Sequence, residues 1–181
     1  MIDALALSRA VEIGSLVFLL LVLLRGWIRK HNNPKAVLII FLSLSVILLS
    51  LKYLSIPAPS HSKLGLLGPA AAFTAIAALY DKKVNKWSVT AYSLIVLVVL
   101  LIPYVWVLSV ISVLLALGSI ALAGWAYHNT KNKGLVFFIL GILVFTGLGI
   151  TARLGLLPHQ TNMLGLTAGV ILWSIPFLKR V

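Results

Sequence analysis

Long apolar runs, each followed by a short polar or basic stretch, occupy nearly the whole chain. About twenty apolar residues are enough for a helix to cross the hydrocarbon core of a bilayer. The pattern therefore predicts an all-α fold, a polytopic membrane bundle of seven transmembrane helices that forms one integral membrane domain over residues 1–181. The predicted spans cover residues 10–27, 36–54, 64–80, two crossings within 86–128, 134–152 and 163–178.

The region between Lys86 and His128 is the least obvious part of this division, because it is apolar almost throughout. It is too long for one crossing and suits two. Pro103 lies near its middle, and proline both interrupts a helix and favours a tight turn. We therefore expect two spans that meet at this proline.

The basic residues test the division, because Lys and Arg are enriched in the cytoplasmic loops of membrane proteins. With the N-terminus outside and the C-terminus cytoplasmic, eleven of the fifteen basic residues fall on the inner side: Arg25, Arg29, Lys30, Lys35, Lys82, Lys83, Lys86, Lys131, Lys133, Lys179 and Arg180. The outer side holds Arg9, Lys52, Lys63 and Arg153. One span across 86–128 would place the last two basic clusters on the wrong side, so we expect seven spans in this orientation.

Composition agrees with a protein that lies mostly within a bilayer. Hydrophobic residues make up 61% of the chain, the formal net charge is +12, and the absence of cysteine excludes disulfides. A basic soluble protein would suggest nucleic acid as a partner, but these charges cluster at span ends, where topology and anionic headgroups account for them. The first apolar run lacks the basic n-region of a cleaved signal peptide and is expected to be retained. We expect a cell or cytoplasmic membrane and no nucleic-acid partner.

A weak internal repeat relates the first and last parts of the chain. Gly-Trp, His-Asn and a closing Lys recur in order, as Gly26-Trp27, His31-Asn32 and Lys35 and then as Gly124-Trp125, His128-Asn129 and Lys133. This recurrence predicts two parallel three-span repeats, residues 8–81 and 104–180, joined by a linker helix over 86–103. The alternative is that Trp, His and Lys collect at membrane interfaces without any duplication.

Four histidines are candidate cofactor ligands. His31 and His128 belong to the predicted inner side, and His61 and His159 to the outer side. If the two repeats face each other across a pseudo-two-fold axis, each pair would be placed to bind a haem or a metal ion, although no particular metal is indicated. Haem ligands usually lie at membrane depth, whereas these residues lie at its margins. The favoured interpretation is therefore four interfacial polar side chains and no cofactor.

Glu12 is the one carboxylate at predicted membrane depth, and an intramembrane charge is a functional hypothesis by default. Arg9 precedes it by three residues and shares its helix face, so a local ion pair would satisfy both side chains. Arg153, at the outer end of the sixth span, is an alternative partner. We expect a structural pair near the outer interface, with a gate or coupling site as the alternative.

Small residues indicate where helices pack. Gly165 and Gly169 form a GxxxG pattern, and Gly141 lies in a glycine-containing sixth span. Such residues let helix backbones approach closely, either within the bundle or against another subunit. Pro69 and Pro176 are expected to break or kink the third and seventh spans.

The chain contains no motif that names a reaction, such as a phosphate-binding loop or a zinc-protease signature. Its loops are short and its predicted membrane-embedded polar groups are few. These features favour a non-catalytic membrane subunit that packs within a larger assembly of other membrane proteins, such as a respiratory or transport complex. The first alternative is a small two-triplet transporter or facilitator, and the second is a haem-binding subunit that uses paired histidines.

Overall fold

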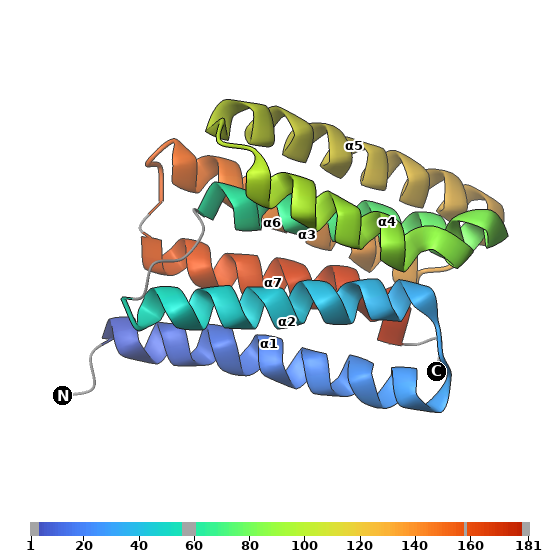
Figure 1. Cartoon of the computed structure of the whole chain (residues 1–181), viewed down its shortest axis with the longest axis horizontal. Coiled ribbons are helices and arrows are strands. Elements are labelled where there is room, and N and C mark those ends of the chain that lie inside the picture. Colours follow the sequence, from blue (N-terminus) through green and yellow to red (C-terminus); the bar gives the residue numbers. More distant parts are fainter. Residues whose placement is uncertain (1–3, 56–60, 158, 179–181) are drawn as a thin grey trace.

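The chain folds into a bundle of long helices that lie along a common axis (Figure 1). The computed structural model describes residues 4–55, 61–157 and 159–178, and these contain seven helices and no strand. They are α1 (Ala4–Arg29), α2 (Asn33–Tyr53), α3 (His61–Tyr80), α4 (Lys82–Leu101), α5 (Val105–Thr130), α6 (Gly134–Arg153) and α7 (His159–Leu178). The all-helical prediction is confirmed, as is the interruption at Pro103, which lies between α4 and α5.

Five helices of the described residues are long and apolar enough to cross a membrane: α1, α2, α4, α5 and α6. The apolar parts of α3 and α7, Gly65–Tyr80 and Gly165–Leu178, are shorter. A bundle of such helices has the composition of a membrane protein, because apolar side chains also cover its outside. Phe18 of α1, Trp87 of α4 and Trp106 of α5 are each about 70% exposed.

The Ala-rich helix α3 is the centre of the packing. It contacts α2, α4 and α5 and, over a shorter stretch, α6, while α1 packs against α2 and α7. Its small buried residues are Ala70, Ala71, Ala72, Ala75 and Ala78. Small side chains permit close backbone approach, and van der Waals contact is the main attraction between helices when the lipid is as apolar as the protein.

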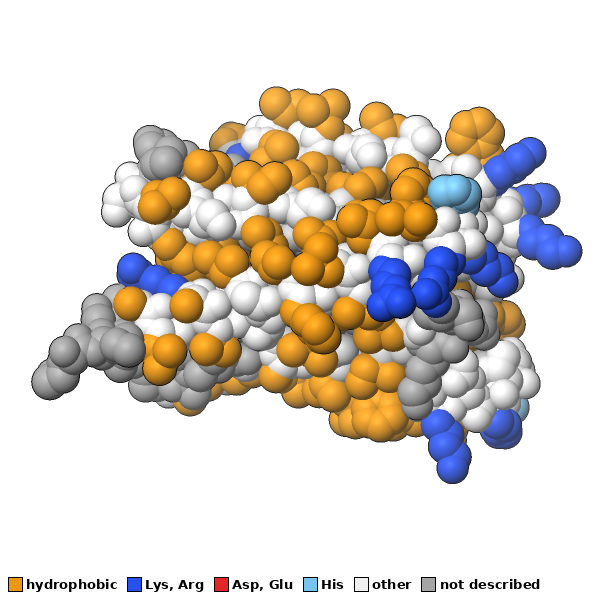
Figure 2. Space-filling view, turned by 90° about the horizontal axis from the view of Figure 1, so that it is seen from below, with side chains coloured by type: hydrophobic (Ala, Val, Ile, Leu, Met, Phe, Trp, Pro, Cys, Tyr) orange, Lys and Arg blue, Asp and Glu red, His pale blue; other side chains and the backbone are white. Residues whose placement is uncertain are grey.

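Successive helices run in opposite directions along the bundle (Figure 1). The ends of α1, α3 and α5 therefore meet the starts of α2, α4 and α6 at one end, which we call the basic end because most described Lys and Arg residues lie there (Figure 2). They are Arg25, Arg29, Lys30, Lys35, Lys82, Lys83, Lys86, Lys131 and Lys133. Arg9, Lys52 and Lys63 lie toward the opposite end.

Neither helical proline breaks its helix. Pro69 lies inside α3 and Pro176 inside α7. A proline lacks the N–H that would bond the carbonyl four residues earlier, so Pro69 leaves the Gly65 carbonyl without its intrahelical donor. The Ser112 hydroxyl of α5 donates to this carbonyl at 3.1 Å. The proline thus creates an acceptor that ties α3 to α5.

Glycines allow α6 and α7 to pack closely. A Cβ atom at Gly141 of α6 would overlap the backbone of Trp173 and would lie 2.6 Å from the Gly169 carbonyl oxygen of α7. A Cβ atom at Gly169 would lie 2.8 Å from the backbone nitrogen of Phe145, and one at Gly165 would overlap Leu148. All three glycines predicted to mediate packing therefore lie in this one interface, within the chain.

We expect Gly141→Ala to destabilise the bundle by about 1–3 kcal/mol, because the added methyl group meets backbone atoms that cannot move independently. The measurement is SDS-induced unfolding in mild detergent, followed by tryptophan fluorescence. Gly147→Ala is the matched control on the same helix, since a Cβ atom there has nothing within 4 Å. The control should unfold at the wild-type midpoint or slightly above it, because alanine favours helices. Equal midpoints for the two variants would contradict this account of the α6–α7 interface.

Candidate functional site

A buried carboxylate marks the strongest candidate site, where α1 lies beside the end of α2. Of the two acidic side chains that the structure describes, Asp81 is exposed and Glu12 is only 4% exposed. The Tyr53 hydroxyl, on the last residue of α2, donates a hydrogen bond to Glu12 Oε2. Glu12 is therefore paired across a helix interface.

Two cations accompany this pair. The Arg9 guanidinium lies over the Tyr53 ring, 5.0 Å from its centroid, and Lys52 lies near enough to Glu12 and Arg9 to interact electrostatically with both. A guanidinium over an aromatic ring is attracted by the ring quadrupole, more strongly where water is excluded. The buried Arg9 Nε has no hydrogen-bond partner within the described part of the chain. Arg9, Glu12, Lys52 and Tyr53 form what we call the α1–α2 polar cluster.

The cluster lies near the edge of the hydrocarbon rather than at its middle. The 21 residues of α2 make a helix about 31 Å long, close to the thickness of a hydrocarbon core. Tyr53 is the last of these residues, so the cluster lies level with the end of α2 that is remote from the basic end. At this depth Arg9 and Lys52 can extend their charged groups toward headgroups while their stems stay buried.

This arrangement suits a clamp between two helices better than a proton path. Tyr53 contacts both Arg9 and Glu12, by its ring and by its hydroxyl group respectively. A proton path would need further carboxylates or polar relays in sequence. Among the described side chains, Glu12 is the one buried carboxylate. The side chain of Arg153, the alternative partner, lies outside the described residues.

Tyr53 was not predicted as a partner of Glu12, although the sequence contained a usable signal. The α1–α2 connection centres on His31 and Asn32, so an antiparallel pair of helices places residue 12 level with residues a little past 50. Near that level, Lys52 and Tyr53 have long side chains that can donate a hydrogen bond to a carboxylate. The prediction considered Arg9 on the same helix and Arg153 on the sixth span, and it overlooked the end of α2, which packs antiparallel to α1.

The structure describes the side chains of two of the four predicted cofactor ligands. His31 is exposed between α1 and α2, where its ring lies 4.8 Å from that of Trp27, and His128 is exposed in the last turn of α5. The side chains of His61 and His159, at the first positions of α3 and α7, lie outside the described residues. In the part of the chain that the structure describes, no three His, Cys, Asp or Glu residues are grouped to hold a metal ion.

Comparison with protein-family models, with curated proteins and with solved structures finds no match for this chain.

If the α1–α2 polar cluster is a structural clamp, Tyr53→Phe should destabilise the protein by about 1–3 kcal/mol, because Glu12 stays buried after losing its donor. SDS-induced unfolding in mild detergent measures this change. Tyr104→Phe is the control, because Tyr104 is 63% exposed between α4 and α5. A Tyr53→Phe midpoint equal to that of the control would show that the hydroxyl contributes nothing to stability.

Proposed function

We propose that the protein is a non-catalytic integral membrane subunit that crosses the bilayer seven times and packs within a larger membrane assembly. The proposal includes a duplicated architecture, in which α1–α3 and α5–α7 are parallel repeats and α4 is the linker helix. It places α1's first residues outside and the basic end on the cytoplasmic side. One observation carries the assembly role: an apolar face on α6 is exposed, whereas its counterpart on α2, a helix that α4 contacts, is mostly half-buried.

Helix direction and charge support seven crossings and this orientation. All seven helices run the length of the bundle and alternate in direction (Figure 1). Most described basic residues gather at one end (Figure 2), as the excess of Lys and Arg in cytoplasmic loops would require. The helices α3 and α7 have shorter apolar segments; α3 packs against four other helices, and α7 packs against α6 and α1.

Burial along the helices supports the duplication, in a register of one hundred residues. Five buried positions of α1 match five of α5 in this register: Glu12, Leu16, Leu19, Leu23 and Gly26 correspond to Ser112, Ala116, Ser119, Ala123 and Ala126, while buried Leu108 has a half-buried counterpart. Five pairs of α2 and α6 are likewise both buried: Pro34 and Gly134, Lys35 and Leu135, Leu38 and Phe138, Phe41 and Gly141, and Leu42 and Ile142. Buried Val37 and Ser45 do not match, because Phe137 is exposed and Phe145 half-buried. The same offset of one hundred residues aligns buried positions in both helix pairs. Two unrelated helix pairs would be expected to need two different offsets.

The connections between helices follow the same register. Ser55 and Gly155 both have positive φ, 60° and 68°, just after α2 and α6. At the basic end, Trp27 packs on His31, and its counterpart Tyr127 packs under the Lys131 ammonium. Equivalent local structure outside the helices supports a common origin more strongly than helical periodicity alone.

Helix neighbours also agree with a pseudo-two-fold relation. A pseudo-two-fold rotation would exchange α1 with α5, α2 with α6 and α3 with α7. It would relate the α1–α2 contact to α5–α6, the α2–α3 contact to α6–α7, and the α1–α7 contact to α3–α5. All six contacts are present. The hundred-residue register differs from the register of the recurring Gly-Trp dipeptides. It pairs Trp27 with Tyr127 rather than with Trp125.

In the proposed duplication, one face of α6 is exposed although the equivalent face of α2 is mostly half-buried. In the first repeat, α4 packs on α2 and α3, and the Asn33 side chain donates to the Asn85 carbonyl at the start of α4. The corresponding stripe of α6 is exposed: Val136, Leu140, Leu143, Gly147 and Ile150. Four of the five counterparts on α2 are partly buried, Ala36, Ile40, Ser43 and Ser50, and the fifth, Ile47, is exposed. A helix from another chain would cover on α6 what α4 covers on α2.

The interface between the repeats favours this role over a small facilitator. Trp173 of α7 is buried there, with its ring centroid 5.8 Å from that of Phe41 in α2 and 6.1 Å from that of Phe138 in α6. A path for a polar solute needs lining groups that replace water. Aromatic rings occupy the region where such a path would have to pass.

Extraction of the tagged protein from its own membrane in mild detergent should recover other membrane chains in a fixed ratio. Gly147→Leu should reduce their recovery, because a large side chain on the stripe keeps a partner helix away, while nothing within 4 Å inside the chain opposes it. Gly124→Leu is the control, since a Cβ atom there is equally unopposed. A wild-type protein recovered only as a monomer that binds a polar solute would refute the subunit role and favour the facilitator.

A further inference from the structure

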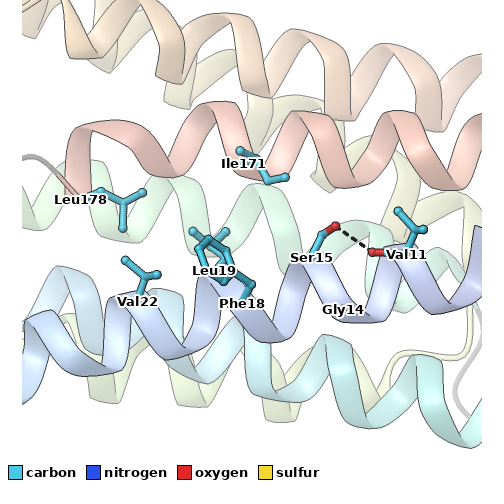
Figure 3. Close-up of a pocket in the computed structure, with 8 residues that line it drawn as sticks. All are labelled: Val11, Gly14, Ser15, Phe18, Leu19, Val22, Ile171 and Leu178. Atoms are coloured by element: carbon cyan, nitrogen blue, oxygen red, sulfur yellow. Dashed lines mark hydrogen bonds between the residues drawn. The ribbon is translucent and has the colours of Figure 1, made fainter.

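An apolar groove runs along the surface between α1 and α7 (Figure 3). Its volume is about 630 Å³, and its walls include Val11, Gly14, Phe18 and Val22 of α1 and Ile171 and Leu178 of α7. Gly14 leaves part of the α1 wall without a side chain, and a Cβ atom there would meet nothing within 4 Å. The groove is therefore an elongated space for an apolar ligand, open to the side of the bundle.

The two halves of the molecule differ at this point, and the difference explains the groove. The equivalent contact in the hundred-residue register is that between α5 and α3. Gly118 there corresponds to Phe18, and a Cβ atom at Gly118 would lie only 3.2 Å from Phe73. Buried Ala71 and Ala78 correspond to Ile171 and Leu178. Small residues let α5 and α3 pack closely, whereas Ile171 and Leu178 of α7 line the groove at the positions where α3 has alanines.

Two arginines lie on α1 beyond one end of the groove. Arg25 and Arg29 follow Val22 by three and seven positions, so they continue the same face of α1 toward the basic end. Both side chains are exposed. The α1 surface therefore combines an apolar strip with a pair of guanidinium groups at one end, and guanidinium groups bind phosphate oxygens in bidentate fashion.

We propose that this surface is a binding site for one anionic phospholipid, with an acyl chain in the groove and its phosphate at Arg25 and Arg29. The α1 backbone rises about 21 Å between Val11 and Arg25, which is enough for a long acyl chain beneath its headgroup. A partner helix would gain nothing from two arginines placed in line with the groove, whereas an anionic lipid uses both parts. The lipid comes from the leaflet on the basic side, and its binding does not depend on the assembly role.

The probes are dioleoyl phosphatidylglycerol and dioleoyl phosphatidylcholine, titrated onto delipidated protein in mild detergent and counted by native mass spectrometry. Wild type should retain one phosphatidylglycerol in preference to phosphatidylcholine. Arg25→Gln and Arg29→Gln should each weaken the phosphatidylglycerol complex by about fivefold, and the double variant by more. Lys82→Gln with Lys83→Gln, at the start of α4, removes equal charge from the basic end and should leave this complex unchanged.

A second variant tests the apolar part independently of charge. Gly14→Leu adds a side chain to the groove from a position where a Cβ atom has nothing within 4 Å, so the folded protein should lose the retained lipid while Gly124→Leu keeps it. Equal weakening by the arginine and lysine variants would overturn the site in favour of diffuse headgroup attraction. Loss of a co-purifying protein from Gly14→Leu, with lipid retention unchanged, would assign the groove to a partner helix instead.

Discussion

No water is present in hydrocarbon to hydrogen-bond a peptide group, so each backbone N–H and C=O must find its partner within the protein. Continuous helices are the simplest way to meet this requirement, and it explains why the described residues are helical almost throughout. Pro69 shows the constraint locally. It leaves the Gly65 carbonyl without its intrahelical donor, and Ser112 of α5 supplies a replacement. A defect in one helix thus becomes a contact with another.

Once every helix is satisfied internally, the arrangement of helices depends on side-chain shape. The alanines of α3 and the glycines of the α6–α7 interface permit close approach, and larger residues prevent it. In the proposed duplication, the two halves of the bundle differ in residue size at equivalent contacts. Gly118 lies where α5 packs closely on α3, while its counterpart Phe18 lines the groove between α1 and α7. The groove and the exposed α6 stripe both lie where the halves differ.

The groove and the α6 stripe both lie on the surface of the molecule, not in its interior. The interior is filled by alanine, leucine and aromatic side chains, and most of its hydroxyl groups bond carbonyls of their own helix, as Ser45, Thr74 and Ser174 do. Among the described residues, the one buried carboxylate, Glu12, accepts a hydrogen bond across the α1–α2 interface. This interior favours the two proposals made for the outside of the molecule, a partner helix on α6 and a lipid along α1.

The sequence alone determined the helical class, the interruption at Pro103 and the end of the bundle that carries most basic residues, because these depend on composition and on the spacing of apolar runs. It also indicated that Glu12 would be paired, since a buried charge requires a partner. The identity of that partner, Tyr53, was decided by the antiparallel packing of α1 on α2. The register of the proposed repeat was likewise hidden, because many apolar residues are interchangeable in sequence while burial depends on which neighbour lies opposite. Tertiary structure alone decided which surfaces were left uncovered, since exposure is a property of the packed bundle and not of any one helix.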